Sequence, residues 1–370
     1  MSKVKRVLHF QGRMGKGGAE SFMMNLYRKV DRRKLQFDFL IYDDFANVTD
    51  YHEEIEKMGG RIFVVTNPKK NIVKYWFEVK RLLAEQQFDI VHNEVYFGGG
   101  INLLLARKQG VTQRIAHSHA TSDGKPSNFF MNLLRKYLHY LLIKEATDFL
   151  AVSKEAGDSL FQGHPYEIIH NGIDLSLYET DEQTREMKRE ELGISLNDFV
   201  VGNIGRLEKQ KNQAYLIDVF SELIQKRPDA KLLIVGAGSL QHNLEKKIDD
   251  MGLSKNVFLL GERDDIPALF QVMDVFCMTS LYEGLPMVGL EAQASRKKVV
   301  LSNTISSDTK LTPNVTFVEL DETKERWSNV ILSQPWVNEV TTELLEYDVS
   351  HTLQQMLKVY KIYQGGVKYV

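Results

Sequence analysis

The chain has one cysteine and eight prolines in 370 residues, and it has no long hydrophobic run. A single thiol, Cys277, excludes an internal disulfide, and its apolar neighbours predict a buried and inert side chain. No stretch approaches the roughly 18 apolar residues of a membrane span. The first ten residues also have too short an apolar run for a signal peptide. We therefore expect a cytoplasmic protein, with peripheral membrane association as an option.

The chain also lacks a large excess of charge of either sign. Its formal net charge of -2 excludes the strongly basic composition of a nucleic-acid-binding protein. The charge is nevertheless uneven. Residues 1–175 carry 25 Lys and Arg against 20 Asp and Glu, whereas the remainder carries 22 against 29. This asymmetry suggests that the first half meets an anionic partner, although an ordinary solvated surface explains it equally well.

The length predicts two domains, because one hydrophobic core rarely serves 370 residues. Short apolar segments alternate with longer helical patterns, which favours parallel sheets covered by helices. The predicted strands are 4–10, 37–41, 61–65, 90–92, 114–117, 149–152, 168–169, 199–204, 231–235, 257–260, 275–278, 299–301 and 315–318. We place the domain boundary at 175/176, ahead of the charged, helix-forming stretch that ends near residue 198.

The most informative segment is 279–294, which places Glu283 and Glu291 eight positions apart. Proline is favoured at the first helical position, so a helix should open near Pro286 with Glu291 in its early turns. The free N–H groups at such a helix start suit a phosphate. Two acceptors flanking an anion site match a nucleotide sugar.

A simpler explanation is that both glutamates are solvated, with Glu283 favoured by the helix dipole. The neighbouring side chains argue against it, because they leave little polar surface around Glu291 and a buried carboxylate needs partners. These neighbours are Leu285, Met287, Val288, Leu290 and Ala292.

This segment resembles the Glu-x7-Glu motif of the retaining glycosyltransferases of family 4, in particular bacterial capsular and exopolysaccharide enzymes. The resemblance implies the GT-B fold, an α/β architecture of two Rossmann-like, doubly wound parallel-sheet domains that face a central cleft. It implies acceptor binding by residues 1–175 and nucleotide-sugar binding by 176–349. In the family a last helix crosses back to the first domain, which here would be 350–370.

The first predicted strand leads into a glycine-rich loop that contains Gly15, Lys16, Gly17 and Gly18. Glycines allow close approach of the backbone to an anion, and the lysine adds positive charge. The loop has neither a Walker ending nor clean Rossmann spacing, and a tight structural turn is equally compatible. It resembles the family's Gly-Gly-Ala-Glu loop, which implies that Gly17 and Gly18 face the donor diphosphate.

Two cations follow the strand at 199–204. Arg206 emerges where this strand ends, and Lys211 precedes the next helix. Cations at a helix N-terminus oppose its dipole, and a bound anion would resolve that conflict. The pair resembles the family's Gly-Arg-Leu…Lys element, whose Arg and Lys bind the donor pyrophosphate.

Weaker elements complete the resemblance. Gly236 and Gly238 resemble a loop near the phosphates, and the segment ending at Arg263 resembles one that contacts the base through its backbone. Asn171 and Gly172 resemble the family's Asn-Gly-Ile-Asp, and these residue types predict a tight turn with a positive φ.

His117 and His119 close a predicted strand. Their spacing, without nearby cysteines or paired carboxylates, argues against a metal site. The resemblance implies that His119 is the active-site histidine near the reacting sugar, with His117 as its packed neighbour. The opposite assignment stays open.

The chain departs from the family pattern after the second glutamate. Arg296-Lys297-Lys298 stands where Gly-Lys-Pro is common, and residues 306–310 replace a Gly-Gly-x-x-Glu segment. These departures leave the donor-sugar contacts in this region without a family counterpart.

The resemblance implies transfer of a hexosyl or N-acetylhexosaminyl unit from a nucleotide sugar to a saccharide acceptor, with UDP as the expected nucleotide. We expect His119 and Glu283 to be catalytic, and we expect no cofactor and no metal. The predicted donor-binding residues are Gly17, Gly18, Arg206, Lys211, Gly236, Gly238, Arg263, Gly284, Leu285, Met287, Val288 and Glu291. A nucleotide-sugar epimerase and a non-catalytic binding subunit are the alternatives.

Residues 128–144 combine Phe, Leu and Tyr with three cations. A half-buried helix lining the cleft explains this composition, and so does a helix that docks at a membrane interface. The second explanation, together with the basic first half, fits an acceptor linked to a polyprenyl diphosphate.

Overall fold

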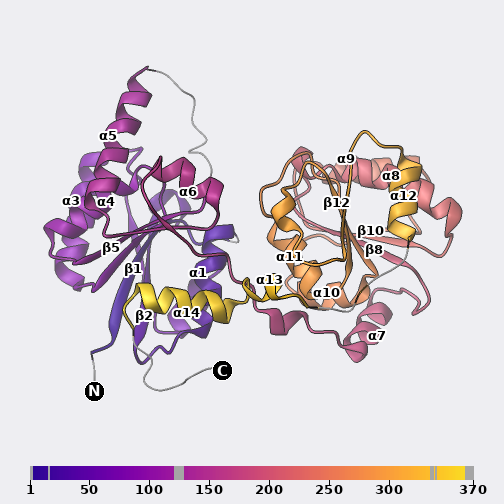
Figure 1. The fold of residues 1–370 in the computed structure, drawn as a ribbon, viewed down its shortest axis with the longest axis horizontal. Helices are drawn as coiled ribbons and strands as arrows, with labels where there is room; N and C mark the ends of the chain where they lie inside the picture. The colour runs from indigo at the N-terminus through magenta and orange to yellow at the C-terminus, as the bar shows by residue number, and fades with distance from the viewer. Residues whose placement is uncertain (1–2, 16, 121–128, 334–336, 338–339, 363–370) are drawn as a thin grey trace. The chain divides into compact units, whose positions relative to one another are not determined.

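Two parallel sheets carry the fold, one of seven strands and one of six (Figure 1). The computed structural model describes residues 3–15, 17–120, 129–333, 337 and 340–362. The chain divides into two compact units. The first comprises Met1–Gly172 and the segment from Val349, and the second comprises Ile173–Asp348. The boundary drawn from the sequence at 175/176 lies within three residues of this division.

The first unit has the strand order β3-β2-β1-β4-β5-β6-β7, and each pair of neighbouring strands is parallel. Its strands are β1 (Lys5–Gly12), β2 (Leu35–Tyr42), β3 (Ile62–Val65), β4 (Ile90–Asn93), β5 (Gln113–Ser118), β6 (Asp148–Ala151) and β7 (Glu167–Ile168). Its helices are α1 (Gly18–Lys29), α2 (His52–Lys57), α3 (Ile72–Gln86), α4 (Gly99–Lys108), α5 (Phe129–Glu145), α6 (Lys154–Phe161) and α14 (Val349–Val359).

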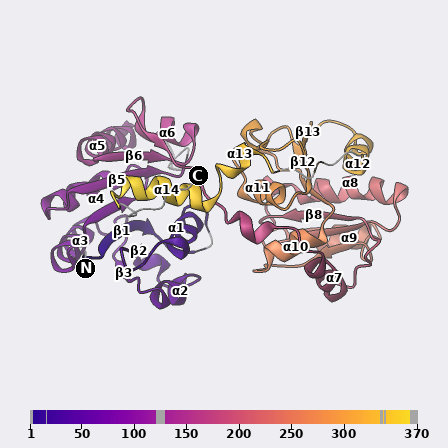
Figure 2. The ribbon, with the colours of Figure 1, turned by 60° about the horizontal axis from the view of Figure 1, so that its bottom comes forward.

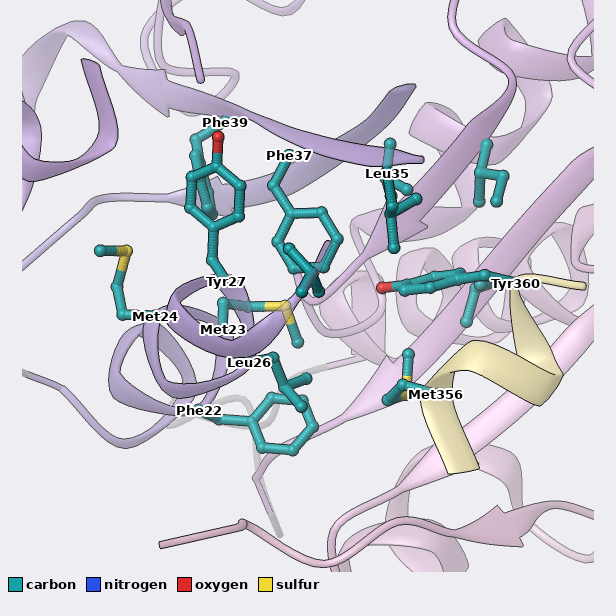
Figure 3. Close-up of a cluster of buried hydrophobic side chains, with 14 of the residues drawn as sticks. Phe22, Met23, Met24, Leu26, Tyr27, Leu35, Phe37, Phe39, Met356 and Tyr360 are labelled. Atoms are coloured by element: carbon teal, nitrogen blue, oxygen red, sulfur yellow. The ribbon is translucent and has the colours of Figure 1, made fainter. Parts of the chain in front are cut away.

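Two apolar cores lie on the two faces of this sheet. Helices α1, α2 and α14 supply one core, and α3, α4, α5 and α6 supply the other. Figure 3 shows the first core, in which Met356 of α14 and Tyr360 just after it share a cluster with Phe37 of β2. The last helix is therefore part of the first unit's core.

The second unit repeats the design, with the strand order β10-β9-β8-β11-β12-β13 (Figure 2). Its strands are β8 (Val200–Ile204), β9 (Lys231–Val235), β10 (Val257–Leu259), β11 (Val275–Met278), β12 (Lys298–Ser302) and β13 (Val315–Val318). Its helices are α7 (Glu182–Glu191), α8 (Gln213–Lys226), α9 (Gln241–Asp250), α10 (Ile266–Val272), α11 (Met287–Ala294), α12 (Lys324–Leu332) and α13 (Thr342–Leu345). Two apolar cores again cover the two sheet faces.

The structure confirms the α/β fold of two parallel sheets and the predicted strands, whose ends shift by a residue or two. Cys277 is fully buried, as expected. The predicted helix start at Pro286 is displaced by one residue, because Pro286 caps α11 and Met287 begins it. Among the described residues, no helix combines the length and apolarity needed to cross a membrane.

The predicted turn at Asn171 and Gly172 is wrong, because neither residue has a positive φ. The structure gives a different reason for the glycine. A Cβ at Gly172 would lie 2.6 Å from Thr352 Oγ1 and 2.7 Å from Val349 Cα. The residue is small because α14 begins against it.

Close backbone approach joins two loops at the carboxyl ends of β8 and β9. A Cβ at Gly236, whose φ is +131°, would lie 2.2 Å from the Gly205 carbonyl oxygen. A Cβ at Gly238 would lie 2.5 Å from the Leu207 carbonyl oxygen. The Leu207 amide donates to Ala237 O at 2.9 Å, which holds the loops together. These two glycines therefore position the backbone around Arg206.

We predict that Gly238→Ala destabilises the second unit by about 1–3 kcal/mol, because the new methyl group meets backbone that cannot move independently. Gly284→Ala is the matched control, since a Cβ there meets nothing within 4 Å. Thermal unfolding measures both variants. Equal melting temperatures for Gly238→Ala and the wild-type protein would contradict the packing argument.

Candidate functional site

In the second unit, the structure joins Lys211 and Glu283 in an ion pair. Lys211 ends the short helix η3 (Lys209–Lys211) after β8, and Glu283 lies in the loop between β11 and α11. The Lys211 Nζ lies 2.5 Å from Glu283 Oε1, and the two side chains are only 16% and 12% exposed. The sequence predicted Lys211 as a donor-binding residue and Glu283 as a catalytic one, but it did not predict that they contact each other.

Hydrogen bonds fix the two loops that carry this pair. Gln210 donates through Nε2 to the Tyr282 carbonyl at 3.0 Å and accepts from the Leu281 amide at 2.8 Å. The Thr279 hydroxyl donates to the Asn212 carbonyl at 3.0 Å. Asn212 has a φ of +55°, which turns the chain from η3 into α8. All five of these residues lie outside the list predicted from the sequence.

Arg206 lies on the same loop with its side chain exposed. Within the described part of the chain, its guanidinium has no ion-pair partner within 4 Å. The Gln213 side chain donates to the Arg206 carbonyl at 3.0 Å, so the backbone is anchored while the guanidinium faces outward. An anchored arginine of this kind can contact an anionic group in two places.

The start of α11 follows Glu283 directly. Gly284 is exposed and borders open space, while Leu285, Met287 and Val288 are partly buried. The first N–H groups of an α-helix have no acceptor within the helix. The Glu283 carbonyl accepts from the Ser306 amide at 3.1 Å, which connects this loop to the segment that departs from the family pattern.

Glu291 lies on α11 and contacts Tyr178 of the short helix η2 (Leu175–Tyr178). Burial raises the pKa of the Glu291 carboxyl to about 7, and the hydrogen bond from the Tyr178 hydroxyl opposes that shift. Burial beside this carboxyl also raises the pKa of Tyr178. The acid is therefore partly buried, with a tyrosine partner that no sequence motif indicated. When ionised, such a carboxylate is a strong acceptor for hydroxyl groups.

Arg263 is engaged elsewhere. Its guanidinium forms ion pairs with Asp265 at 2.7 Å and Glu191 at 3.1 Å, and Lys188 joins the same network. Its side chain therefore holds α7 against the loop before α10, and only backbone groups of this segment stay available for a ligand. Lys298 is similarly occupied, since its Nζ donates to the carbonyl of Val330.

In the first unit, the glycine-rich loop leads into α1. A Cβ at Gly17 would lie 2.3 Å from Glu20 Oε2, and Glu20 forms an ion pair with Arg13 at 2.7 Å. Gly17 therefore makes room for this internal pair. A Cβ at Gly18 would meet nothing within 4 Å, and Lys16 lies outside the described residues.

The two candidate histidines have different surroundings. His117 is buried in β5, and its Nδ1 lies 3.1 Å from His92 Nε2. His119 follows the strand, and its Nε2 lies 3.9 Å from Glu94 Oε2. The two rings are in contact, with centroids 4.2 Å apart. Burial lowers the pKa of His119 to about 3, so its imidazole is neutral at physiological pH.

One group among the described residues has the composition of a metal site. His9, His92 and Glu94 can bring their ligand atoms within 4.8 Å of one another. Both ring nitrogens of His92 are already hydrogen-bonded, to Tyr360 and to His117. His9 Nδ1 is bonded to Glu94 at 2.9 Å. A metal would have to replace these bonds, and the expectation of a metal-free protein stays a prediction.

The comparisons with known proteins cover nearly the whole chain. Residues 184–327 match the family described as glycosyl transferases group 1, and residues 16–177 match Glycosyltransferase Family 4. EpsF of Bacillus subtilis, provisionally named a glycosyltransferase, is 33% identical over 98% of this chain and 97% of its own. An Escherichia coli protein named UDP-Gal:alpha-D-GlcNAc-diphosphoundecaprenol alpha-1,3-galactosyltransferase is 30% identical over 72% of each chain.

Solved structures show the same fold at lower identity. Alr3699/HepE of Anabaena, crystallised in complex with UDP, has a TM-score of 0.76 and 22% identity, covering 97% of this chain and 100% of its own. A glycosyltransferase from Rickettsia africae has a TM-score of 0.77 and 17% identity, covering 97% and 98%. The chain therefore belongs to the family 4 glycosyltransferases, and its two parallel-sheet units are those of the GT-B fold.

Proposed function

We propose that this protein is a retaining glycosyltransferase that moves a hexosyl or N-acetylhexosaminyl unit from a UDP-sugar to a saccharide on a lipid diphosphate. The reaction would serve capsule or exopolysaccharide synthesis. The observation that carries the proposal is the Lys211–Glu283 pair beside exposed Arg206 and the start of α11. The names of relatives support the substrates, since the E. coli protein acts on a diphosphoundecaprenol-linked sugar.

In this proposal the second unit binds the donor. Arg206, Lys211 and the first N–H groups of α11 neutralise the departing diphosphate, which develops negative charge as its bond to the sugar breaks. Lys211 is held by Glu283, so its charge is positioned before any substrate contact. Glu283 accepts from a sugar hydroxyl, and Glu291 accepts from the ribose hydroxyls.

The expected retention of configuration constrains the chemistry. A double displacement needs a carboxylate about 5 Å from its acid partner, on the opposite face of the ring. Glu283 is already ion-paired with Lys211. The other carboxylate among the predicted donor-site residues, Glu291, is hydrogen-bonded to Tyr178. We therefore favour attack on the same face. The bond from the anomeric carbon to the phosphate oxygen breaks, the acceptor oxygen bonds that carbon, and its proton passes to the leaving phosphate.

Replacing the exposed arginine tests the function directly. We expect Arg206→Ala to lower kcat/KM for sugar transfer by about 100-fold or more, because one charge that stabilises the leaving group is lost. The fold should be unaffected, since the guanidinium has no ion pair among the described residues. Arg326→Ala, an exposed arginine of the same unit, is the control. The assay follows labelled sugar from UDP-sugars to polyprenyl-diphosphate saccharides, with and without EDTA.

Two outcomes would contradict the proposal. Turnover of Arg206→Ala within a few-fold of the wild type would remove the diphosphate role. Conversion of the UDP-sugar to another UDP-sugar without any acceptor would favour the epimerase alternative.

A second prediction concerns Glu291. The pKa of about 7 lies above the ordinary 4.5, so the folded protein binds more protons than the unfolded chain between these values. Stability therefore falls as pH rises from about 4.5 to about 7, and the penalty is complete above that range. We expect Glu291→Gln to raise the melting temperature at pH 8 and leave it unchanged at pH 4.5.

The same variant should bind UDP about tenfold more weakly or worse, because a charged acceptor is lost. Glu222→Gln, at an exposed glutamate, is the control for both measurements. A Glu291→Gln protein that is less stable at pH 8, or that binds UDP normally by calorimetry, would refute the role of Glu291.

Helix α5 supports a membrane-bound acceptor. Six of its large apolar side chains are 46–79% exposed, namely Phe129, Phe130, Leu133, Leu134, Tyr137 and Tyr140. Arg135, Lys136 and Lys144 lie on the same helix. Aromatic and cationic side chains together favour the interface of an anionic bilayer. We propose that α5 docks on the membrane where the lipid-linked acceptor resides.

We expect the wild-type protein to float with anionic liposomes at low salt and to be released at high salt, because charge contributes to binding. Replacing Phe129, Phe130 and Leu133 together by serine should abolish flotation. Phe77→Ser is the control, since Phe77 is 63% exposed on α3 of the same unit. Equal flotation of the triple variant and this control would exclude docking through α5.

A further inference from the structure

The first unit buries histidines where its sheet should be apolar. Strands of an all-parallel sheet are covered on both faces and normally carry hydrophobic side chains. Here His9 of β1, His92 of β4 and His117 of β5 lie in one row, with ring centroids 5.0 and 5.2 Å apart. This row borders the apolar cluster that contains Phe37, because the ring centroids of His9 and Phe37 are 4.5 Å apart. Burying these polar rings costs stability, so they need a compensating role.

One half of this cluster is closed by hydrogen bonds. His92 Nδ1 lies 2.7 Å from the Tyr360 hydroxyl, and His92 Nε2 lies 3.1 Å from His117 Nδ1. His117 packs against one side of the His119 ring. Phe22 packs against the same ring, with the two ring centroids 5.4 Å apart. One side of the His119 ring therefore packs against a buried row of hydrogen-bonded side chains, which is formed by His117, His92 and Tyr360.

The other half is incomplete. Glu94 Oε1 is bonded to His9 Nδ1 at 2.9 Å, but Glu94 Oε2 and both nitrogens of His119 are buried without a hydrogen-bond partner among the residues that the structure describes. A buried polar atom without a hydrogen-bond partner lowers the stability of the folded protein. His119 Nε2 and Glu94 Oε2 are 3.9 Å apart, so a movement of about 1 Å would satisfy both.

The surroundings determine which atoms carry protons. The Glu94 side chain is 1% exposed, and among the described residues the charged group that acts on it is another acid, Glu20. Burial therefore raises the pKa of Glu94 well above its usual range. A neutral carboxyl that accepts from His9 Nδ1–H through Oε1 carries its proton on Oε2, facing His119 Nε2. His119 then carries its own proton on Nδ1.

We propose that Glu94 is a positioning residue for His119, which it orients and fixes in the tautomer with the proton on Nδ1. This inference rests on the proposed function, because it assumes that His119 acts beside the reacting sugar. Nδ1–H is then the group through which His119 can donate to a substrate hydroxyl. Glu94 itself transfers no proton and carries no charge in this role.

The chemistry of glutamine provides a sharp test. In Glu94→Gln, the amide oxygen can accept from His9 and the amide N–H can donate to His119, so it reproduces a neutral carboxyl. We expect kcat within a few-fold of wild type for Glu94→Gln. We expect a 10- to 100-fold loss for Glu94→Leu, because the imidazole is no longer held in place. The KM for the donor should be unchanged in both.

A measurement without turnover accompanies the kinetics. Long-range nitrogen–proton NMR spectra of protein labelled in its histidines report the tautomer of each ring, and His119→Gln assigns the His119 signals. We expect the Nδ1–H form in the wild type and in Glu94→Gln, and a mixture in Glu94→Leu. Glu145→Leu removes another buried carboxyl of this unit, paired with Arg107 on the α4 and α5 face, and controls for lost stability.

Each outcome decides the proposal. An equal loss of kcat in Glu94→Gln and Glu94→Leu would show that Glu94 acts as a charged base. An unchanged kcat in both variants would show that Glu94 has no role in catalysis. A His119 tautomer that is the same in the wild type and in both Glu94 variants would also overturn the proposal. A wild-type protein that shows the Nδ1–H form but transfers no sugar would refute the proposed function while leaving the positioning intact.

Discussion

The candidate site of the second unit depends on one contact, the ion pair between Lys211 and Glu283. The two residues follow β8 and β11, which are neighbours in the second sheet. Because both side chains are mostly buried, solvent screens the pair weakly, and loss of either partner leaves a charge without compensation. The pair thereby holds two loops at a fixed separation. The orientation of Arg206 and the start of α11 both follow from those loops.

The fold could be predicted from the sequence because its signals are local. Short apolar segments such as 231–235 and 275–278 are bounded by helical patterns, and the observed strands coincide with them. What failed was the interpretation of particular residues. Asn171 and Gly172 have the composition of a tight turn, but the glycine is required by a helix that begins at residue 349. Local composition carries no information about such a distant neighbour.

The site was predictable to the extent that its residues follow strand ends. Arg206, Lys211, Glu283, Glu291 and His119 could be named because each lies in a motif within a few residues of a strand or helix boundary. Their partners could not. Tyr178 meets Glu291 across more than a hundred residues, and Glu94 meets His9 across 85. A buried polar contact between distant segments leaves no periodic signal, so only the folded structure reveals it.

The position of α14 in the first unit has a consequence for synthesis. The residues of the second unit, Ile173–Asp348, leave the ribosome before this helix does. Domains generally fold as units as they emerge. The nascent protein therefore completes its middle while its beginning still lacks Met356 and Tyr360, which fill the gap beside Phe37 and cap His92. The histidine row can therefore gain its hydrogen bond to the Tyr360 hydroxyl only after the end of α14 has been synthesised.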